Sequence, residues 1–250
     1  MAKNIAVAGK GGTGKTTFAS LVIRYLIEKT NDSILAVDAD PNSNLNEALG
    51  VDIDITISQV LEDTKNPKAI PEGMSKNMYI QYKLAQALIE TDRVDLLAMG
   101  GPQGPGCYCY PNDILKKHLK DLSENYDYIV ADNEAGLEHI SRQTIPQVDH
   151  LFIISDGSAR GIRSAGRVHE LVKDLKKPIK NIYLVITKTD EKSLEILQDE
   201  ISKTGLQLTG WVPMDPKVTE FDVAGKPLIS LPEESPALKA IYSILDSIKL

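Results

Sequence analysis

The sequence has few cysteines, no excess of positive charge and no long apolar run, and each shortage excludes a class of protein. Its two cysteines are one residue apart, which does not make a structural disulfide in a reducing compartment. The formal net charge of −7 disfavours non-specific nucleic-acid binding and repels anionic membranes. The apolar runs are only as long as a strand, well short of the roughly 20 residues that span a bilayer. Gly9 leaves no room for the apolar core of a secretory signal, so we expect a cytoplasmic protein.

Short apolar runs alternate along the chain with segments of helical spacing. The expected strands are residues 4–8, 33–38, 94–99, 126–131, 151–155, 182–186 and 206–212, and the expected helices are 16–29, 45–49, 57–61, 80–90, 112–122, 160–173, 194–201 and 236–248. This alternation predicts an α/β fold with a doubly wound, mostly parallel sheet and helices on both faces. No repeat, low-complexity tract or linker divides the chain, so we expect one domain spanning residues 1–250.

Residues 9–17 fit the phosphate-binding pattern G-x-x-x-x-G-K-[ST] and lie between an expected strand and an expected helix, as a P-loop must. The glycines let consecutive backbone N–H groups turn inward around phosphate oxygens, and the helix points its positive end at the same anion. Lys15 is expected to contact the β- and γ-phosphates, and the Thr16 hydroxyl to bind Mg²⁺. The expected phosphate-binding residues are Gly11, Gly12, Thr13, Gly14, Lys15, Thr16 and Thr17.

Acidic residues follow two of the expected strands. Asp132 follows the apolar run 128–131, where a P-loop protein needs an acidic residue to hold the magnesium shell. Asp38 and Asp40 follow the strand 33–38, and the carboxyl end of a parallel strand is the ligand side of such a sheet. Each aspartate taken alone could instead be a loop residue or a helix cap.

Cys107 and Cys109 follow a segment rich in glycine and proline, residues 100–106. In an extended segment residues i and i+2 face the same side, so both sulfurs can bind one metal ion. Two thiolates fill only half of a tetrahedral site for a soft metal, and the same pair from a second subunit would complete it. The pair therefore favours a homodimer, while two packed thiols without a metal remain an alternative.

The P-loop, with Lys10 directly after its first glycine, resembles the deviant Walker A motif K-G-G-x-G-K-[ST] of the MinD/ParA/nitrogenase iron-protein class of dimerising ATPases. This resemblance implies that Lys10 acts in trans on the nucleotide of the partner subunit. It also implies that Asp38 supports the magnesium shell and that Asp40 orients or deprotonates the attacking water. The expected catalytic residues are therefore Lys10, Lys15 and Asp40.

The same resemblance indicates where the base binds, with one departure. The family commonly has an Asn-Lys or Asn-Arg pair after a late strand, where this chain has Thr187 and Lys188. Residues Thr187 to Asp190 also resemble the guanine-specific N/T-K-x-D motif of GTPases, so GTP stays open beside ATP. The segment from Pro213 to Asp215 resembles the family's Pro-x-Asp loop near the adenine, which favours ATP and ADP as ligands.

Lys10, residues 38–42, the Cys-x-Cys pair and residues 132–139 together resemble the CooC family of nickel-insertion ATPases, which mature carbon monoxide dehydrogenase and have relatives that serve acetyl-CoA synthase. The resemblance covers essentially the whole chain. It implies an ATP-dependent, homodimeric metallochaperone that binds Ni²⁺ or Zn²⁺ through Cys107 and Cys109 and delivers nickel to one of these client enzymes. A positioning ATPase of the ParA or MinD kind and an iron–sulfur reductase resembling the nitrogenase iron protein are the two alternatives.

Overall fold

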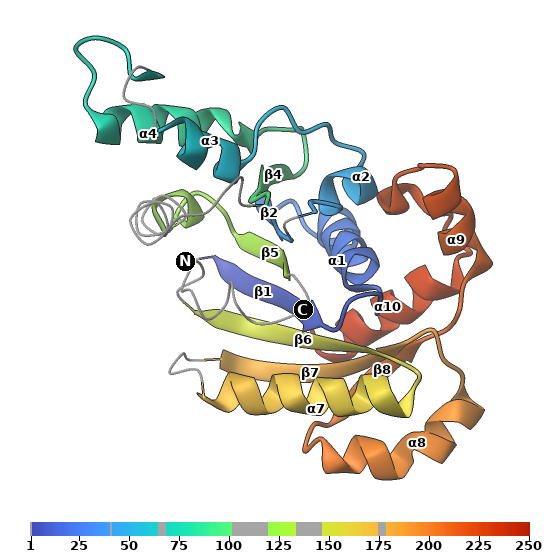
Figure 1. Ribbon diagram of the computed structural model, residues 1–250. Coiled ribbons are helices and arrows are strands. Elements are labelled where there is room, and N and C mark those ends of the chain that lie inside the picture. The colour runs from blue at the N-terminus through green and yellow to red at the C-terminus, as the bar shows by residue number, and fades with distance from the viewer. Residues whose placement is uncertain (1, 41, 65–68, 102–119, 134–146, 175–178) are drawn as a thin grey trace.

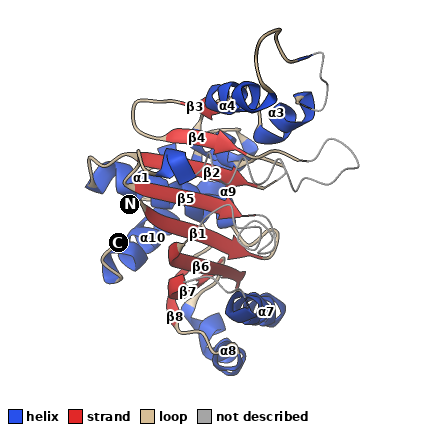
Figure 2. Ribbon diagram, turned by 90° about the vertical axis from the view of Figure 1, so that its left-hand side faces the viewer, coloured by secondary structure: helices blue, strands red, loops and turns tan. Residues whose placement is uncertain are grey.

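The structure is a computed structural model, which describes residues 2–40, 42–64, 69–101, 120–133, 147–174 and 179–250. Its strands form one eight-stranded sheet in the order β3-β4-β2-β5-β1-β6-β7-β8 (Figure 2). All neighbouring strands are parallel except β3 and β4, so the predicted mostly parallel sheet is confirmed. The strands are β1 (Lys3–Gly9), β2 (Ile34–Ala39), β3 (Leu88–Ile89), β4 (Asp95–Ala98), β5 (Tyr128–Asn133), β6 (Val148–Asp156), β7 (Ile179–Thr187) and β8 (Leu208–Val212).

Helices cover both faces of the sheet (Figure 1). One face carries α1 (Lys15–Lys29), α2 (Leu45–Leu49), α9 (Pro216–Val223), the 3₁₀ helix η2 (Leu228–Ser230) and α10 (Pro236–Ser247). The opposite face carries α3 (Ile57–Asp63), α4 (Lys76–Gln86), α7 (Ala159–Asp174) and α8 (Glu191–Lys203). Each face has its own apolar core, as a doubly wound fold requires.

The central strand β1 supplies side chains to both cores because successive side chains of a strand point to opposite faces. Ile5 and Val7 belong to the core under α1, whereas Ala6 and Ala8 belong to the core on the opposite face. All four residues are fully buried. The run 4–8 was predictable as a buried strand for this reason.

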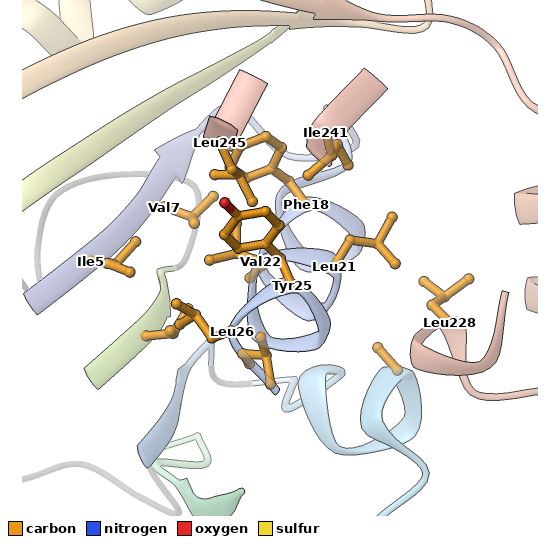
Figure 3. Packing of buried hydrophobic residues seen from close by; sticks show 14 of the residues in the cluster. Ile5, Val7, Phe18, Leu21, Val22, Tyr25, Leu26, Leu228, Ile241 and Leu245 are labelled. Carbon is orange, nitrogen blue, oxygen red and sulfur yellow. The ribbon is translucent and has the colours of Figure 1, made fainter. Parts of the chain in front are cut away.

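Helix α1 anchors the P-loop to the core (Figure 3). Phe18 is almost fully buried, and its ring lies 5.0 Å from the ring of Phe152 in β6. Further along α1, Leu21, Val22, Tyr25 and Leu26 form the buried stripe that faces β1 and α10, as Figure 3 shows. The start of α1 is therefore held at the sheet edge where β1 ends.

The structure corrects three expectations about the elements. The helix expected over residues 80–90 is present with different bounds, because α4 begins after its cap Ser75 and ends at Gln86. Leu88 and Ile89 instead pair with Leu97 and Leu96 of β4, so strand pairing overrides the local helical spacing. Helix α9 and η2 were not predicted, and β5 continues to Asn133, so that Asp132 lies inside the strand.

The C-terminal helix α10 turns its apolar residues into the core. Ala237, Leu238, Ile241, Ile244 and Leu245 are all buried there. The helix expected over residues 236–248 is confirmed, and it is part of the core. Among the described residues no helix combines the length and apolarity needed to cross a membrane.

Candidate active site

The parallel strands end at one edge of the sheet, and the candidate residues gather there. The P-loop follows β1, Asp38 and Asp132 are Cα partners at the ends of β2 and β5, and Thr187 is the last residue of β7. This is the edge at which open α/β sheets bind their ligands.

The P-loop needs glycine for two separate reasons. A Cβ on Gly9 would collide with the carbonyl oxygen of Ile154 in the neighbouring strand. Gly14 is the N-cap of α1 at φ 85°, a left-handed conformation that costs other residues energy, and it caps the helix without a side chain. The first N–H groups of α1 therefore stay available to an anion.

The two lysines of the loop have different surroundings. Lys15 is buried to 8% exposure, and its Nζ lies 3.5 Å from the carbonyl oxygen of Lys10, which also accepts a 2.8 Å hydrogen bond from the Thr13 hydroxyl. The side chain of Lys10 is exposed and has no hydrogen-bond or ion-pair partner among the described residues. Lys15 thus faces the site of its own chain, whereas the ammonium of Lys10 is available to another molecule.

Thr16 and Asp132 form the candidate magnesium site. The Thr16 hydroxyl donates a 2.5 Å hydrogen bond to Asp132 Oδ2, while Asp132 Oδ1 is buried without a hydrogen-bond partner in the described part of the chain. Burial, reinforced by the nearby carboxylates of Asp38 and Asp40, raises the pKa of Asp132 to about 7. Hydroxyl and carboxylate oxygens are the ligands that Mg²⁺ prefers. A bound cation would be coordinated by Asp132 Oδ1 and would offset the negative charge of the buried carboxylate. The residues present therefore fit magnesium.

Asp38 supports the loop that follows β2. Its Oδ1 accepts a 3.0 Å hydrogen bond from the N–H of Asp40, and its Oδ2 accepts a 2.8 Å bond from the N–H of Leu45. The carboxyl group is fully buried, and burial raises its pKa to about 6 although these two bonds oppose the shift. Asp38 therefore holds the segment on which Asp40 lies.

Asp40 is partly exposed and faces the cavity beside the P-loop. Its Oδ1 accepts hydrogen bonds of 2.9 and 3.0 Å from the backbone and side-chain nitrogens of Asn42. These contacts orient a carboxylate next to the phosphate-binding residues, which is where an aspartate that positions water would be needed.

Two adjoining cavities lie against the P-loop. The larger, of about 630 Å³, is lined by the P-loop, by Glu47 of α2, by Asp222 of α9 and by Lys226 in the turn after α9. The smaller, of about 300 Å³, has mainly apolar walls from α1, β8, α9 and α10. Gly14, Thr17, Lys188 and Asp222 line both cavities.

Thr187 and Lys188 contact the backbone of the P-loop. The Thr187 hydroxyl lies 2.6 Å from the carbonyl oxygen of Thr13 and 3.1 Å from that of Ser155, and Lys188 Nζ donates a 2.9 Å bond to the carbonyl of Gly12. Lys188 adopts a left-handed backbone conformation, at φ 56°. In this structure both residues brace the P-loop, and their contact with a base stays a prediction.

Asp190, the residue that suggested guanine recognition, is exposed and caps α8. Its Oδ1 accepts a 2.8 Å hydrogen bond from the N–H of Ser193, which holds the pKa of the carboxyl group below its usual value. It is absent from the described lining of both cavities. This placement favours the adenine over the guanine interpretation.

Pro213 and Asp215 line the smaller cavity, but the carboxylate of Asp215 is engaged within the protein. Its Oδ1 accepts from the N–H of Lys217 at the start of α9, and its Oδ2 accepts from the Ser235 hydroxyl and the N–H of Ala237 at the start of α10. Burial acts to raise its pKa, yet these bonds hold it below the usual value. Asp215 thus joins two helix starts, and its contact with a nucleotide stays a prediction.

Cys107 and Cys109 lie outside the described residues, as do Pro41 and residues 134–139 of the segments that carry the CooC resemblance. Within the described part of the chain, no group of three or more His, Cys, Asp or Glu side chains could hold a metal ion. The two described histidines have structural contacts, with His150 Nδ1 3.1 Å from the Tyr183 hydroxyl and His169 Nδ1 3.0 Å from the carbonyl of Thr204.

The sequence interpretation missed several residues that line the larger cavity: Asn44, Glu47, Asp222 and Lys226. Asp222 and Lys226 belong to α9 and the turn after it. The consecutive Asp215 and Pro216 are a cap and first-turn pair, and this signal could have located the helix.

A glycine loop between β1 and α1, a buried lysine and a threonine–aspartate pair define a P-loop site for a nucleoside triphosphate. Residues 5–228 match the family described as the CobQ/CobB/MinD/ParA nucleotide binding domain. The chain belongs to this family, whose members bind and hydrolyse ATP.

Two relatives and one solved structure are similar to this chain over most of its length. An uncharacterized ATP-binding protein of Methanocaldococcus jannaschii is 42% identical over 98% of this chain and 97% of its own length. The carbon monoxide dehydrogenase accessory protein CooC of Rhodospirillum rubrum is 28% identical over 94% of this chain and 91% of its own. The septum site-determining protein MinD of Pyrococcus horikoshii, solved as a complex with Mg-ADP, shares the fold with a TM-score of 0.71 and 22% identity over 99% of this chain and 96% of its own.

Proposed function

We propose that the protein is an ATP-driven, homodimerising metallochaperone that inserts nickel into carbon monoxide dehydrogenase or a related nickel enzyme. The observation that carries this proposal is the Cys-x-Cys pair, Cys107 and Cys109, in a chain similar over most of its length to a carbon monoxide dehydrogenase accessory protein. Two thiolates from each of two subunits would supply four sulfur ligands to one ion of Ni²⁺ or Zn²⁺. The metal would be cargo that leaves with the client enzyme.

Different residues of the chain would bind the phosphates, hold the magnesium ion and position the attacking water. Lys15 would contact the β- and γ-phosphates, and Thr16 and Asp132 would hold a magnesium ion that neutralises phosphate charge. Asp38 would keep the segment after β2 in place, supported by its bonds to the N–H groups of Asp40 and Leu45. Asp40, oriented by Asn42, would position or deprotonate the attacking water.

Lys10 supports the dimer. Its exposed ammonium has no partner among the described residues of its own chain, so a second subunit's nucleotide is an available ligand. In a two-fold symmetric pair each Lys10 would complete the opposite site. ATP binding would then bring the two Cys-x-Cys segments together, and hydrolysis would let them separate and weaken their hold on the ion.

Activation of a nickel-free client enzyme tests the proposal. Nickel-loaded protein is mixed anaerobically with nickel-free carbon monoxide dehydrogenase and Mg-ATP, and carbon monoxide oxidation is followed. We expect activation that requires hydrolysable ATP and is lost in the Cys107→Ser, Cys109→Ser double variant. A double variant that activates as well as the wild type would refute the role of the cysteines, and equal activation without ATP would refute the coupling.

The two alternative functions have less support. A positioning ATPase that used its C-terminal helix as a membrane anchor would need a free apolar face, whereas the apolar residues of α10 are buried in the core. A reductase would carry an iron–sulfur cluster, and a visible charge-transfer absorption in anaerobically purified protein would support that function instead of the nickel proposal.

A further inference from the structure

Asp222 lies at the junction between the two cavities. It is one of four residues that line both, together with Gly14, Thr17 and Lys188. Its side chain is exposed, and its carboxylate has no hydrogen-bond partner among the described residues. Partial burial raises the pKa of this carboxyl group above its usual value, although Lys188 opposes the shift. An acceptor without a partner at a ligand cavity is available to hydrogen-bond donors of the ligand.

The two cavities suit different parts of a nucleotide. The larger cavity is lined by the glycines of the P-loop and by Lys15 and Thr16, which suit the phosphates. The smaller cavity is lined by Phe18, Val212 and Ile241, which suit a planar base. A nucleotide that fills both must place its sugar where the cavities meet.

We propose that Asp222 is a specificity-determining residue that accepts hydrogen bonds from the ribose hydroxyls of the nucleotide and selects ribonucleotides over deoxyribonucleotides. The inference rests on the placement of the nucleotide proposed above, and it is independent of nickel. It gives α9, the helix that the sequence interpretation missed, a direct role in substrate choice.

Lys188 lies beside Asp222 but does not engage its carboxylate. Lys188 Nζ is held 2.9 Å from the carbonyl of Gly12, so its ammonium is engaged by the P-loop and forms no hydrogen bond with Asp222 in this structure. The carboxylate keeps both oxygens for a ligand. A carboxylate with two free oxygens can accept from two adjacent hydroxyls, and the ribose carries such a pair while 2′-deoxyribose does not.

The affinity ratio between ATP and 2′-deoxy-ATP is the appropriate measurement. Removing a negative charge near a polyphosphate strengthens the binding of any triphosphate, and this effect is equal for the two ligands and cancels in their ratio. Isothermal titration in the presence of Mg²⁺ with the full chain gives both dissociation constants. We expect the wild type to bind ATP about tenfold more tightly than 2′-deoxy-ATP, as for one hydrogen bond to a charged group.

The variants Asp222→Asn and Asp222→Ala should lower that ratio toward one, and 3′-deoxy-ATP should show whether the second hydroxyl contributes. Glu220→Gln is the matched control, because Glu220 lies on the same helix, carries the same charge and pairs with Lys217 outside both cavities. Its ratio should equal that of the wild type. If both Asp222 variants bind ATP with the same ratio as the wild type, the role of Asp222 in selecting ribose is overturned. If the wild type binds no ATP, the proposed placement of the nucleotide in the two cavities is itself overturned.

Discussion

Replacing Asp132 by Asn should stabilise the metal-free protein at alkaline pH. Burial raises the pKa of Asp132 from 3.8 to about 7 in the folded chain, so the folded state binds this proton more tightly than the unfolded state. The wild type therefore loses stability as pH rises from about 4 to about 7. The cost approaches about 4 kcal/mol at pH 8 and falls to about 2 kcal/mol at pH 5. Asn carries no charge and still offers an acceptor to Thr16, so it avoids this cost.

Urea denaturation in a chelator at pH 5 and pH 8 measures the effect. We expect Asp132→Asn to exceed the wild type at pH 8 by up to about 4 kcal/mol, and by about half as much at pH 5. Mg-ADP should reverse the order, because it stabilises only the chain that can bind the ion well. The exposed Asp199→Asn is the control for the loss of one charge. If Asp132→Asn is no more stable than the wild type at pH 8, or if its gain in stability is equal at pH 5 and pH 8, the raised pKa of Asp132 is not the cause.

Three further predictions concern the same site. Phe18→Ala should lower the free energy of unfolding by about 3–5 kcal/mol, because it removes the ring that packs on Phe152 and leaves a cavity between α1 and β6. A loss below about 1 kcal/mol in urea denaturation would contradict this prediction. Thr187→Val should cost about 1–3 kcal/mol and weaken ATP binding by titration, because the buried carbonyl of Thr13 loses its donor. Thr187→Ser should retain both properties, and an equal defect in Ser and Val would exclude the hydroxyl as the cause. Lys10→Ala should change thermal stability by less than about 0.5 kcal/mol yet abolish ATP-dependent dimerisation in sedimentation, since its side chain is exposed. Dimers of normal affinity would contradict the role in trans.

Much of the fold and the phosphate site is predictable because local signals and tertiary structure agree there. The glycines, Lys15 and Thr16 lie between a continuous apolar run and a helical stripe, and the fold requires that order. The parallel strands bring Asp38 and Asp132 to one edge, so a sequence interpretation that finds the strands also places the aspartates together.

The remaining features depend on contacts between distant segments. The pairing of Leu88 with Leu97 is not visible in the spacing of residues 80–90. The link from Thr187 to Thr13 joins residues 174 positions apart, so the support that Thr187 gives to the P-loop is not visible in the short motif that contains it. The role of Asp222 depends on two cavities that form only when α9 packs beside the P-loop.

Native mass spectrometry of the protein with Ni²⁺, Mg²⁺ and a non-hydrolysable ATP analogue tests the central claim most directly, because it counts subunits, nucleotides and metal in one complex. We expect a dimer with two nucleotides and one nickel ion, and a Cys107→Ser, Cys109→Ser variant that dimerises with nucleotide but carries no nickel. Monomers that each bind nickel independently of nucleotide, or a cysteine variant that retains the ion, would contradict it.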